Sequence, residues 1–316
     1  MFAARGLAVS LSVFVMVYCV LSLAVCLAWR AVQSRIERLP VRRVADLLFA
    51  LRMFPVATAA VITVAFTVPS FLLLEPRAIE EPLGEIPLVL GIFGAALGIF
   101  GIVNARVAVR RASRRISTWT NAAQSVECCA HIPVLRISSV TPAMTATGIV
   151  RPRVLLSAAA ESMLTANELH TALNHEVAHV RRRDNLKKLL LRFVTFPGMS
   201  ALEAAWLEAT EMAADDAAVS DAGEALDLAA ALIKLSRLGP AQPSTDLTTA
   251  LLHSPASIMN ARVERLISWS DDRFVSPYRF SPWYGVSAAV AAVALFAVTY
   301  SQLLVHVHTA TEWLVR

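Results

Sequence analysis

The chain has 316 residues, of which 56% are hydrophobic and only 17% are charged, and its formal net charge is +5. This composition excludes a disordered chain and is unusual for a soluble enzyme, so it predicts a membrane protein with a water-facing part. The basic balance is compatible with nucleic acid or with anionic lipid as a partner, and the positions of the arginines decide between them.

Three apolar runs in the first third of the chain are each long enough to cross a bilayer, which takes about 20 residues. We expect a membrane domain over residues 1–105, with transmembrane helices at about 7–29, 53–74 and 86–105. A fourth apolar run, Trp283–Val305, has Trp and Tyr near its ends, as is typical of membrane interfaces. It predicts a fourth transmembrane helix within residues 283–316, followed by a short extracellular tail.

Arginines are concentrated in two of the connections between these runs. Six lie between the first and second runs and five follow the third, whereas Glu75, Glu80, Glu81 and Glu85 lie between the second and third. Because basic connections stay in the cytoplasm, residues 106–282 are predicted to form a cytoplasmic domain and the N-terminus to face outside. Topology and anionic lipid then explain the positive charge, and no direct nucleic acid partner is expected.

The cytoplasmic domain has the pattern of an α+β domain. A helix is expected over about 107–128, and two short strands over Val134–Val140 and Ile149–Ser157, with Pro142 and Gly148 marking the connection between them. Pro152 indicates that the second strand is bulged or lies at an edge of the sheet. Further helices are expected over Ala166–Val194, 200–219, Glu224–Leu238 and Ser257–Trp269.

The strongest chemical signal is His175-Glu176-Val177-Ala178-His179, an HExxH motif within the first of these helices. Thr165 and Glu168 form a capping-box pattern that predicts where this helix begins. His175 and His179 are four residues apart, so they share a helix face and can both bind one zinc ion. Glu176 is then placed to take a proton from a zinc-bound water. The alternative is a surface helix whose histidines share no ligand.

Zinc needs a third protein ligand, and the alanine-rich run that holds Glu211 and Asp215 offers one. These two acidic residues share a helix face because they are four apart. Glu211 is the predicted ligand, and Asp215 is expected to bond the far nitrogen of a ligating histidine. Glu208, one turn earlier, is the rival ligand, and a solvated acidic face is the alternative to both.

An HExxH motif followed by glutamate and, four residues later, aspartate resembles the gluzincin metallopeptidases. The resemblance is closer to the BlaR/MecR-type membrane metallopeptidases, an antirepressor and sensor-transducer family. Three stretches carry it: Gly148–Leu156 is similar to that family's strand before the active-site helix, His179–Asp184 to the extension of the zinc helix, and Glu211–Asp215 to the third-ligand helix. The order of three membrane helices, a zinc domain and a fourth helix is similar as well.

The resemblance implies a mostly α membrane protein with four transmembrane helices in a bacterial plasma membrane. Its cytoplasmic, gluzincin-like α+β domain would be a zinc metallopeptidase with one Zn²⁺ per chain. The implied substrate is a cytoplasmic DNA-binding repressor of the BlaI/MecI type, cleaved in signal transduction or an antibiotic response. In the sensor-transducers a penicillin-binding domain follows the fourth helix, whereas only His306–Arg316 follow it here. Direct beta-lactam sensing is therefore not expected, and either a separate sensor protein or the membrane helices themselves would have to receive the signal.

Supporting roles are predicted for three more residues. His253 or Arg262 is a candidate donor to the oxyanion, because His253, Pro255 and Arg262 are similar to the HP…R segment of HtpX/CAAX-type membrane proteases. The alternative is a capping histidine and a surface arginine. Asp184 is expected either to orient the zinc helix by pairing with an arginine or to form a simple surface ion pair. The strand around Val150–Leu156 is expected to pair with an extended substrate by strand addition.

Other functions are weighed against this one. A quality-control protease similar to HtpX would use the same chemistry on misfolded membrane proteins. A non-catalytic signalling scaffold with a vestigial site would have no need of Glu176. A transporter is disfavoured because the four apolar runs lack interior Asp, Glu, Lys and Arg.

Overall fold

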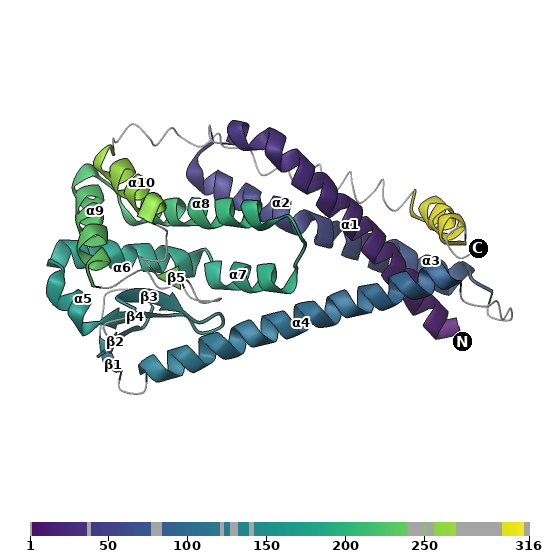
Figure 1. The fold of residues 1–316 in the computed structure, drawn as a ribbon, viewed down its shortest axis with the longest axis horizontal. Helices are drawn as coiled ribbons and strands as arrows, with labels where there is room; N and C mark the ends of the chain where they lie inside the picture. Colours follow the sequence, from purple (N-terminus) through teal and green to yellow (C-terminus); the bar gives the residue numbers. More distant parts are fainter. Residues whose placement is uncertain are drawn as a thin grey trace. The chain divides into compact units, whose positions relative to one another are not determined.

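The computed structural model describes residues 2–36, 39–76, 84–120, 123–126, 132–138, 142–238, 249–250, 256–269 and 299–312. The chain divides into two compact units (Figure 1). The helical unit comprises Met1–Arg30, Met53–Phe100 and Val275–Arg316, and the α+β unit comprises Ala31–Arg52 and Gly101–Phe274.

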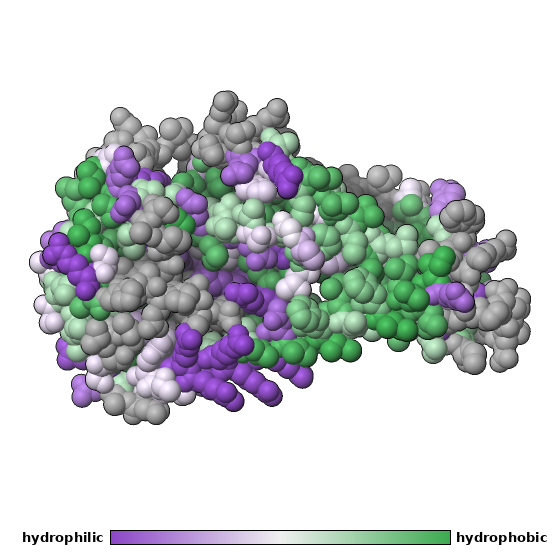
Figure 2. Space-filling view, viewed as in Figure 1, coloured by the Kyte–Doolittle hydropathy of each residue, from purple (hydrophilic) through white to green (hydrophobic). Residues whose placement is uncertain are grey.

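Long apolar helices dominate the first third of the chain: α1 (Phe2–Ile36), α2 (Val41–Ile62), the π-helical turn η1 (Thr63–Thr67), α3 (Val68–Leu74) and α4 (Glu85–Thr120). Three stretches, Phe2–Ala31, Val41–Leu74 and Glu85–Thr120, are long and apolar enough to cross a membrane. The three spans predicted within residues 1–105 fall inside them. Hydrophobic side chains cover much of the exposed surface of these helices (Figure 2), as lipid contact requires. Of the predicted fourth span, residues 283–298 lie outside the described residues, and residues 299–312 are helical.

Glycines of α4 allow α1 to approach closely within the helical unit. A Cβ atom on Gly91 would lie 3.1 Å from the Cα atom of Ala8, and one on Gly94 would lie 2.9 Å from Cγ2 of Val15. Helices in lipid associate through small residues of this kind, because no hydrophobic effect drives them together.

A proline shapes the end of the second membrane stretch. Pro69 has no N–H to donate to the carbonyl of Ala65, four residues earlier. The stretch passes through the π-helical turn η1 just before this proline. The Tyr300 hydroxyl donates to the Ala65 carbonyl over 2.8 Å. The C-terminal helical segment 299–312 is therefore tied to this stretch where its helical hydrogen bonding is interrupted.

The α+β unit contains a five-stranded sheet in the order β1-β2-β4-β3-β5. β2 and β4 are parallel, and the other neighbouring strands are antiparallel. The strands are β1 (Gln124–Val126), β2 (Val134–Ile137), β3 (Met144–Thr147), β4 (Arg153–Ser157) and β5 (Thr249–Ala250). The helices are α5 (Ala158–Met163), α6 (Ala166–Arg181), α7 (Asp184–Phe193), α8 (Ser200–Ala218), α9 (Ala222–Ser236) and α10 (Ala256–Ile267).

Four predictions about this unit were wrong. β4 is an interior strand between β2 and β3, so it is not an edge that could pair with a substrate, and Pro152 precedes it without interrupting its ladder. The segment expected to connect two strands is itself strand β3, and Gly148, with φ of +87°, forms the turn into β4. The helix expected over 107–128 ends at Thr120, and the helix expected over Ala166–Val194 is broken at Arg183, which has φ of +55°.

α6 lies at the centre of the α+β unit, between the sheet and α8, and also contacts α9 (Figure 1). The main core joins inner side chains of β2, β3 and β4 to α9 and α10, with Leu228, Leu232 and Leu235 fully buried. Because α6 is enclosed in this way, polar side chains on it at positions 175, 176 and 179 are removed from water.

Candidate metal centre

The start of α6 is fixed by the predicted capping box. The Thr165 side chain accepts a hydrogen bond from the Glu168 backbone N–H over 3.3 Å, and Glu168 accepts one from the Thr165 N–H over 2.8 Å. Lys234 of α9 lies 2.7 Å from the same carboxylate. The helix that carries the HExxH motif is thus held at its first turn both locally and by a neighbouring helix.

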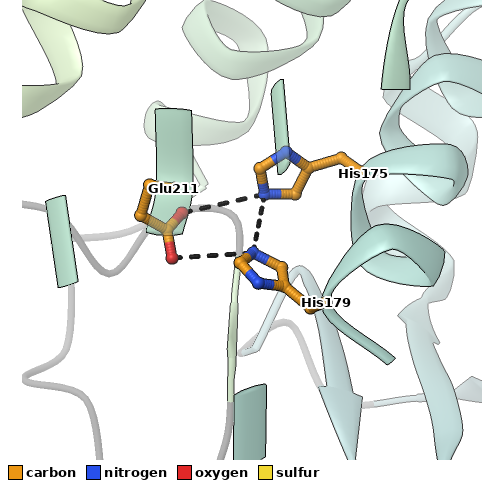
Figure 3. Close-up of side chains that lie close together, drawn as sticks. All are labelled: His175, His179 and Glu211. Atoms are coloured by element: carbon orange, nitrogen blue, oxygen red, sulfur yellow. Dashed lines mark hydrogen bonds and ion pairs between the residues drawn. The ribbon is translucent and has the colours of Figure 1, made fainter. Parts of the chain in front are cut away.

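Two histidines of α6 and a glutamate of α8 meet in a buried cluster (Figure 3). The Nε2 atoms of His175 and His179 are 3.1 Å apart, and they lie 3.7 Å and 3.6 Å from the two carboxylate oxygens of Glu211. Ligand atoms of a tetrahedral zinc ion, bound at about 2.0–2.1 Å, are about 3.3 Å apart. The three side chains therefore fit a zinc ion between them, with a donor set of two nitrogens and a carboxylate.

Each histidine has a carboxylate behind it. Asp215 Oδ1 lies 2.9 Å from Nδ1 of His175, and Asp184 Oδ2 lies 2.8 Å from Nδ1 of His179. A proton on each Nδ1 leaves the Nε2 lone pairs directed at the point shared with Glu211. All four side chains are buried, so these carboxylates orient the rings without competition from water.

Arg262 of α10 completes the charge balance of the cluster. Its guanidinium contacts Asp215 through two hydrogen bonds of 2.8 Å and 2.6 Å, and Glu211 through one of 3.1 Å. Arg262 is fully buried, so the alternative of a surface arginine was wrong. His253, the other candidate oxyanion donor, lies outside the described residues.

Charged forms are favoured at several of these positions despite burial. Burial lowers the pKa of His175, but hydrogen bonds to Asp215 and Glu211 outweigh it and raise the pKa to about 9 in the metal-free protein. Burial raises the pKa of Asp215, but Arg262 and His175 outweigh it and hold the pKa below its usual range. The carboxylates are therefore anionic, and a metal ion that binds here must displace a proton from His175.

Glu176 lies beside the cluster and faces β3. One carboxylate oxygen accepts a hydrogen bond of 2.6 Å from the Ala146 backbone N–H, and the other oxygen has no hydrogen-bond partner within the described part of the chain. Burial raises the pKa of Glu176. A carboxylate held in this way has one oxygen available to exchange a proton.

Two contacts at the site could not be predicted from the sequence. Asn185, at the start of α7, donates from Nδ2 to the carbonyls of Ala146 and Gly148 over 3.2 Å and 3.3 Å, so it fixes β3 and the turn after it to the start of α7. The contact of Arg262 with Asp215 spans two helices far apart in sequence. Glu208, the rival ligand, is partly exposed and is not part of the cluster.

A buried HExxH helix with a glutamate from a second helix defines the class of the site as that of a metallopeptidase. The sequence matches the model of the BlaR1 peptidase family M56 over residues 80–266, more than half of the chain. The chain therefore belongs to this family of membrane metallopeptidases. A search of curated proteins found no match.

Proposed function

We propose that this protein is a zinc-dependent endopeptidase of a bacterial plasma membrane, with its α+β unit in the cytoplasm. The proposed substrate is a cytoplasmic DNA-binding repressor of the BlaI/MecI type, cleaved in response to a signal such as an antibiotic. Family membership and three membrane-compatible helices support this proposal. The observation that carries it is Glu176, buried beside His175, His179 and Glu211 with one oxygen unpaired among the described residues.

In this proposal His175, His179 and Glu211 hold the ion. A zinc ion there supplies polarisation of the scissile carbonyl and of the attacking water. Glu176 takes a proton from that water and passes it to the leaving amine. Its Ala146 N–H contact fixes one oxygen, so the other is directed at the reacting atoms. Asp215, Asp184 and Arg262 keep the ligands in place.

The intact base argues against a scaffold with a vestigial site. A signalling scaffold does not benefit from an unpaired, buried carboxylate, which costs about 1–3 kcal/mol or more when it is not hydrogen-bonded. The same geometry serves a quality-control protease, and only the range of substrates separates these two functions.

The test uses the full-length protein purified in detergent, compared with Glu176→Gln, Glu211→Ala and, as a control on the same helix, Glu208→Ala. We expect about one zinc per chain by mass spectrometry in the wild type, Glu176→Gln and Glu208→Ala, and little in Glu211→Ala. Cleavage of a co-expressed repressor should disappear in Glu176→Gln and Glu211→Ala alone. A folded wild-type protein without zinc, or cleavage retained in Glu176→Gln, would overturn the proposed mechanism. Broad cleavage of misfolded membrane proteins without repressor cleavage would favour the quality-control function.

A further inference from the structure

A second group of metal-ligating side chains lies in the helical unit, on elements that the proposed peptidase function does not use. Glu75 directly follows α3, and His308 and Glu312 lie on the C-terminal helical segment 299–312. His308 and Glu312 are four residues apart, so they share a helix face. One ligand atom from each of the three residues lies within 4.8 Å of the others.

Two separate contacts fix the C-terminal segment beside the second membrane stretch. Tyr300 donates to the carbonyl of Ala65 and its ring lies 5.8 Å from that of Phe66, while His308 lies beside Glu75. Residues 300–308 rise about 12 Å along a helix, so the two contacts are made at points about two turns apart. The position of His308 beside Glu75 therefore agrees with an independent anchor two turns away.

His308 lies between the two carboxylates, with a different ring nitrogen toward each, and it can offer one of these nitrogens to a shared ion. His308 Nε2 lies 3.4 Å from a Glu312 oxygen, and Nδ1 lies 3.8 Å from Glu75 Oε2. The second distance is too long for a hydrogen bond, and Nδ1 is buried with no hydrogen-bond partner within the described part of the chain. Only one of the two nitrogens can bind a shared ion, and one ligand atom from each of the three residues lies within 4.8 Å of the others.

Arg5 holds the Glu75 carboxylate in position. Its Nη2 atom lies 3.2 Å from Oε1 of Glu75, on the oxygen that does not face His308. The Glu75 side chain is 10% exposed and that of His308 is 16% exposed, whereas Glu312 is 46% exposed. Two ligands are thus fixed in a sheltered position, and the third lies open to solvent, through which an ion can enter.

We propose that Glu75, His308 and Glu312 form a second metal site, which binds a divalent transition-metal ion such as Zn²⁺. One imidazole and two carboxylates match the preferences of zinc, cobalt and nickel, whereas calcium and magnesium take oxygen ligands alone and copper(I) prefers sulfur. Exposure of Glu312 and the positive charge of Arg5 make this site weaker than the HExxH centre. Bound metal joins the C-terminal segment to the end of α3.

The test is a zinc titration of the full-length protein in detergent, followed by calorimetry and by metal analysis after desalting. The variants are His308→Ala and Glu312→Gln, and the matched control is His306→Ala, an exposed histidine two residues earlier on another face of the same helix. We expect a tight first equivalent of zinc in all of them, and a second, weaker equivalent of equal affinity in the wild type and His306→Ala. In His308→Ala and Glu312→Gln the affinity of the second equivalent should fall at least 10-fold.

The two metal sites can fail independently. Glu211→Ala should remove the first equivalent and leave the second. A wild-type protein that lacks only the first equivalent would contradict the proposed peptidase and not the second site. No second equivalent in the wild type, or a second equivalent that survives in His308→Ala, would overturn the proposed second site. An unchanged elution volume and an intact first equivalent show that His308→Ala and Glu312→Gln are folded, and a variant that fails this check is replaced by His308→Gln.

Discussion

Arg262 forms a bidentate ion pair with Asp215, with Nε–Oδ2 and Nη2–Oδ1 distances of 2.8 Å and 2.6 Å. Asp215 in turn lies 2.9 Å from Nδ1 of His175, so the guanidinium on α10 acts on a candidate metal ligand of α6 through one carboxylate. It also contacts the Glu211 carboxylate directly. Two members of the metal cluster therefore depend on a residue that comes from a third helix.

The first prediction concerns this arginine. Arg262→Ala leaves Asp215 buried without its partner, and removing one member of a buried ion pair costs about 3–5 kcal/mol. Zinc affinity should fall about 10–100-fold, as is typical when a partner of a metal ligand is lost. Arg265→Ala is the control, because Arg265 lies on the same helix and pairs with the more exposed Asp216. Competition with a zinc chelator measures the affinity, and equal values for the two variants would refute the role of Arg262.

The second prediction concerns Asp184. Asp184→Ala removes the acceptor 2.8 Å from His179 Nδ1, so the imidazole loses its preferred tautomer and orientation. We expect zinc affinity to fall about 10–100-fold, and the repressor-cleavage rate at limiting zinc to fall with it. Asp216→Ala serves as the control, because its partner Arg265 does not contact the cluster. If excess zinc fails to restore cleavage in Asp184→Ala, a structural role rather than ligand orientation is indicated.

Helical periodicity explains how much of the site could be predicted from the sequence. His175 and His179, and likewise Glu211 and Asp215, lie four residues apart within one helix, so their shared faces follow from local geometry alone. Asp184 reaches His179 only because the chain turns through a left-handed conformation at Arg183, and helical periodicity does not predict such a turn. Arg262 comes from α10, and its position depends on tertiary packing that the sequence does not encode locally.

The sheet was predicted less well, for a related reason. Met144–Thr147 contains small residues and is flanked by Pro142 and Gly148, which are typical of a connection. Its residues do alternate between apolar and polar side chains, but the flanking turn residues outweighed this short signal, and all four are buried because β3 pairs with β4 and β5. The interior position of β4 likewise depends on pairing with β2 and β3, which a single strand does not reveal.

The third prediction concerns the start of the zinc helix. Thr165→Ala removes the side-chain acceptor for the Glu168 N–H and should lower the free energy of unfolding of the α+β unit by about 0.5–2 kcal/mol. Ser162→Ala is the control, because this exposed hydroxyl bonds only the carbonyl of Ala159 among the described residues. Denaturant unfolding followed by circular dichroism compares the two. Zinc content should be unchanged in both, and a large loss of zinc in Thr165→Ala would show that the cap also positions the ligands.

The fourth prediction concerns the turn that positions the strand next to Glu176. Gly148 has φ of +87°, and a Cβ atom there would lie 2.5 Å from the Arg151 carbonyl oxygen, so alanine requires the β3–β4 turn to change. The left-handed conformation alone costs about 1–2 kcal/mol for a residue with a Cβ. Because Asn185 bonds the carbonyls of Gly148 and Ala146, a displaced turn also shifts the Ala146 N–H that holds Glu176.

Gly148→Ala should therefore reduce cleavage more than zinc content. Gly98→Ala is the control, because its Cβ would meet no described atom within 4 Å, and it should change neither. Parallel loss of zinc and cleavage in Gly148→Ala would indicate general unfolding instead of a displaced Glu176.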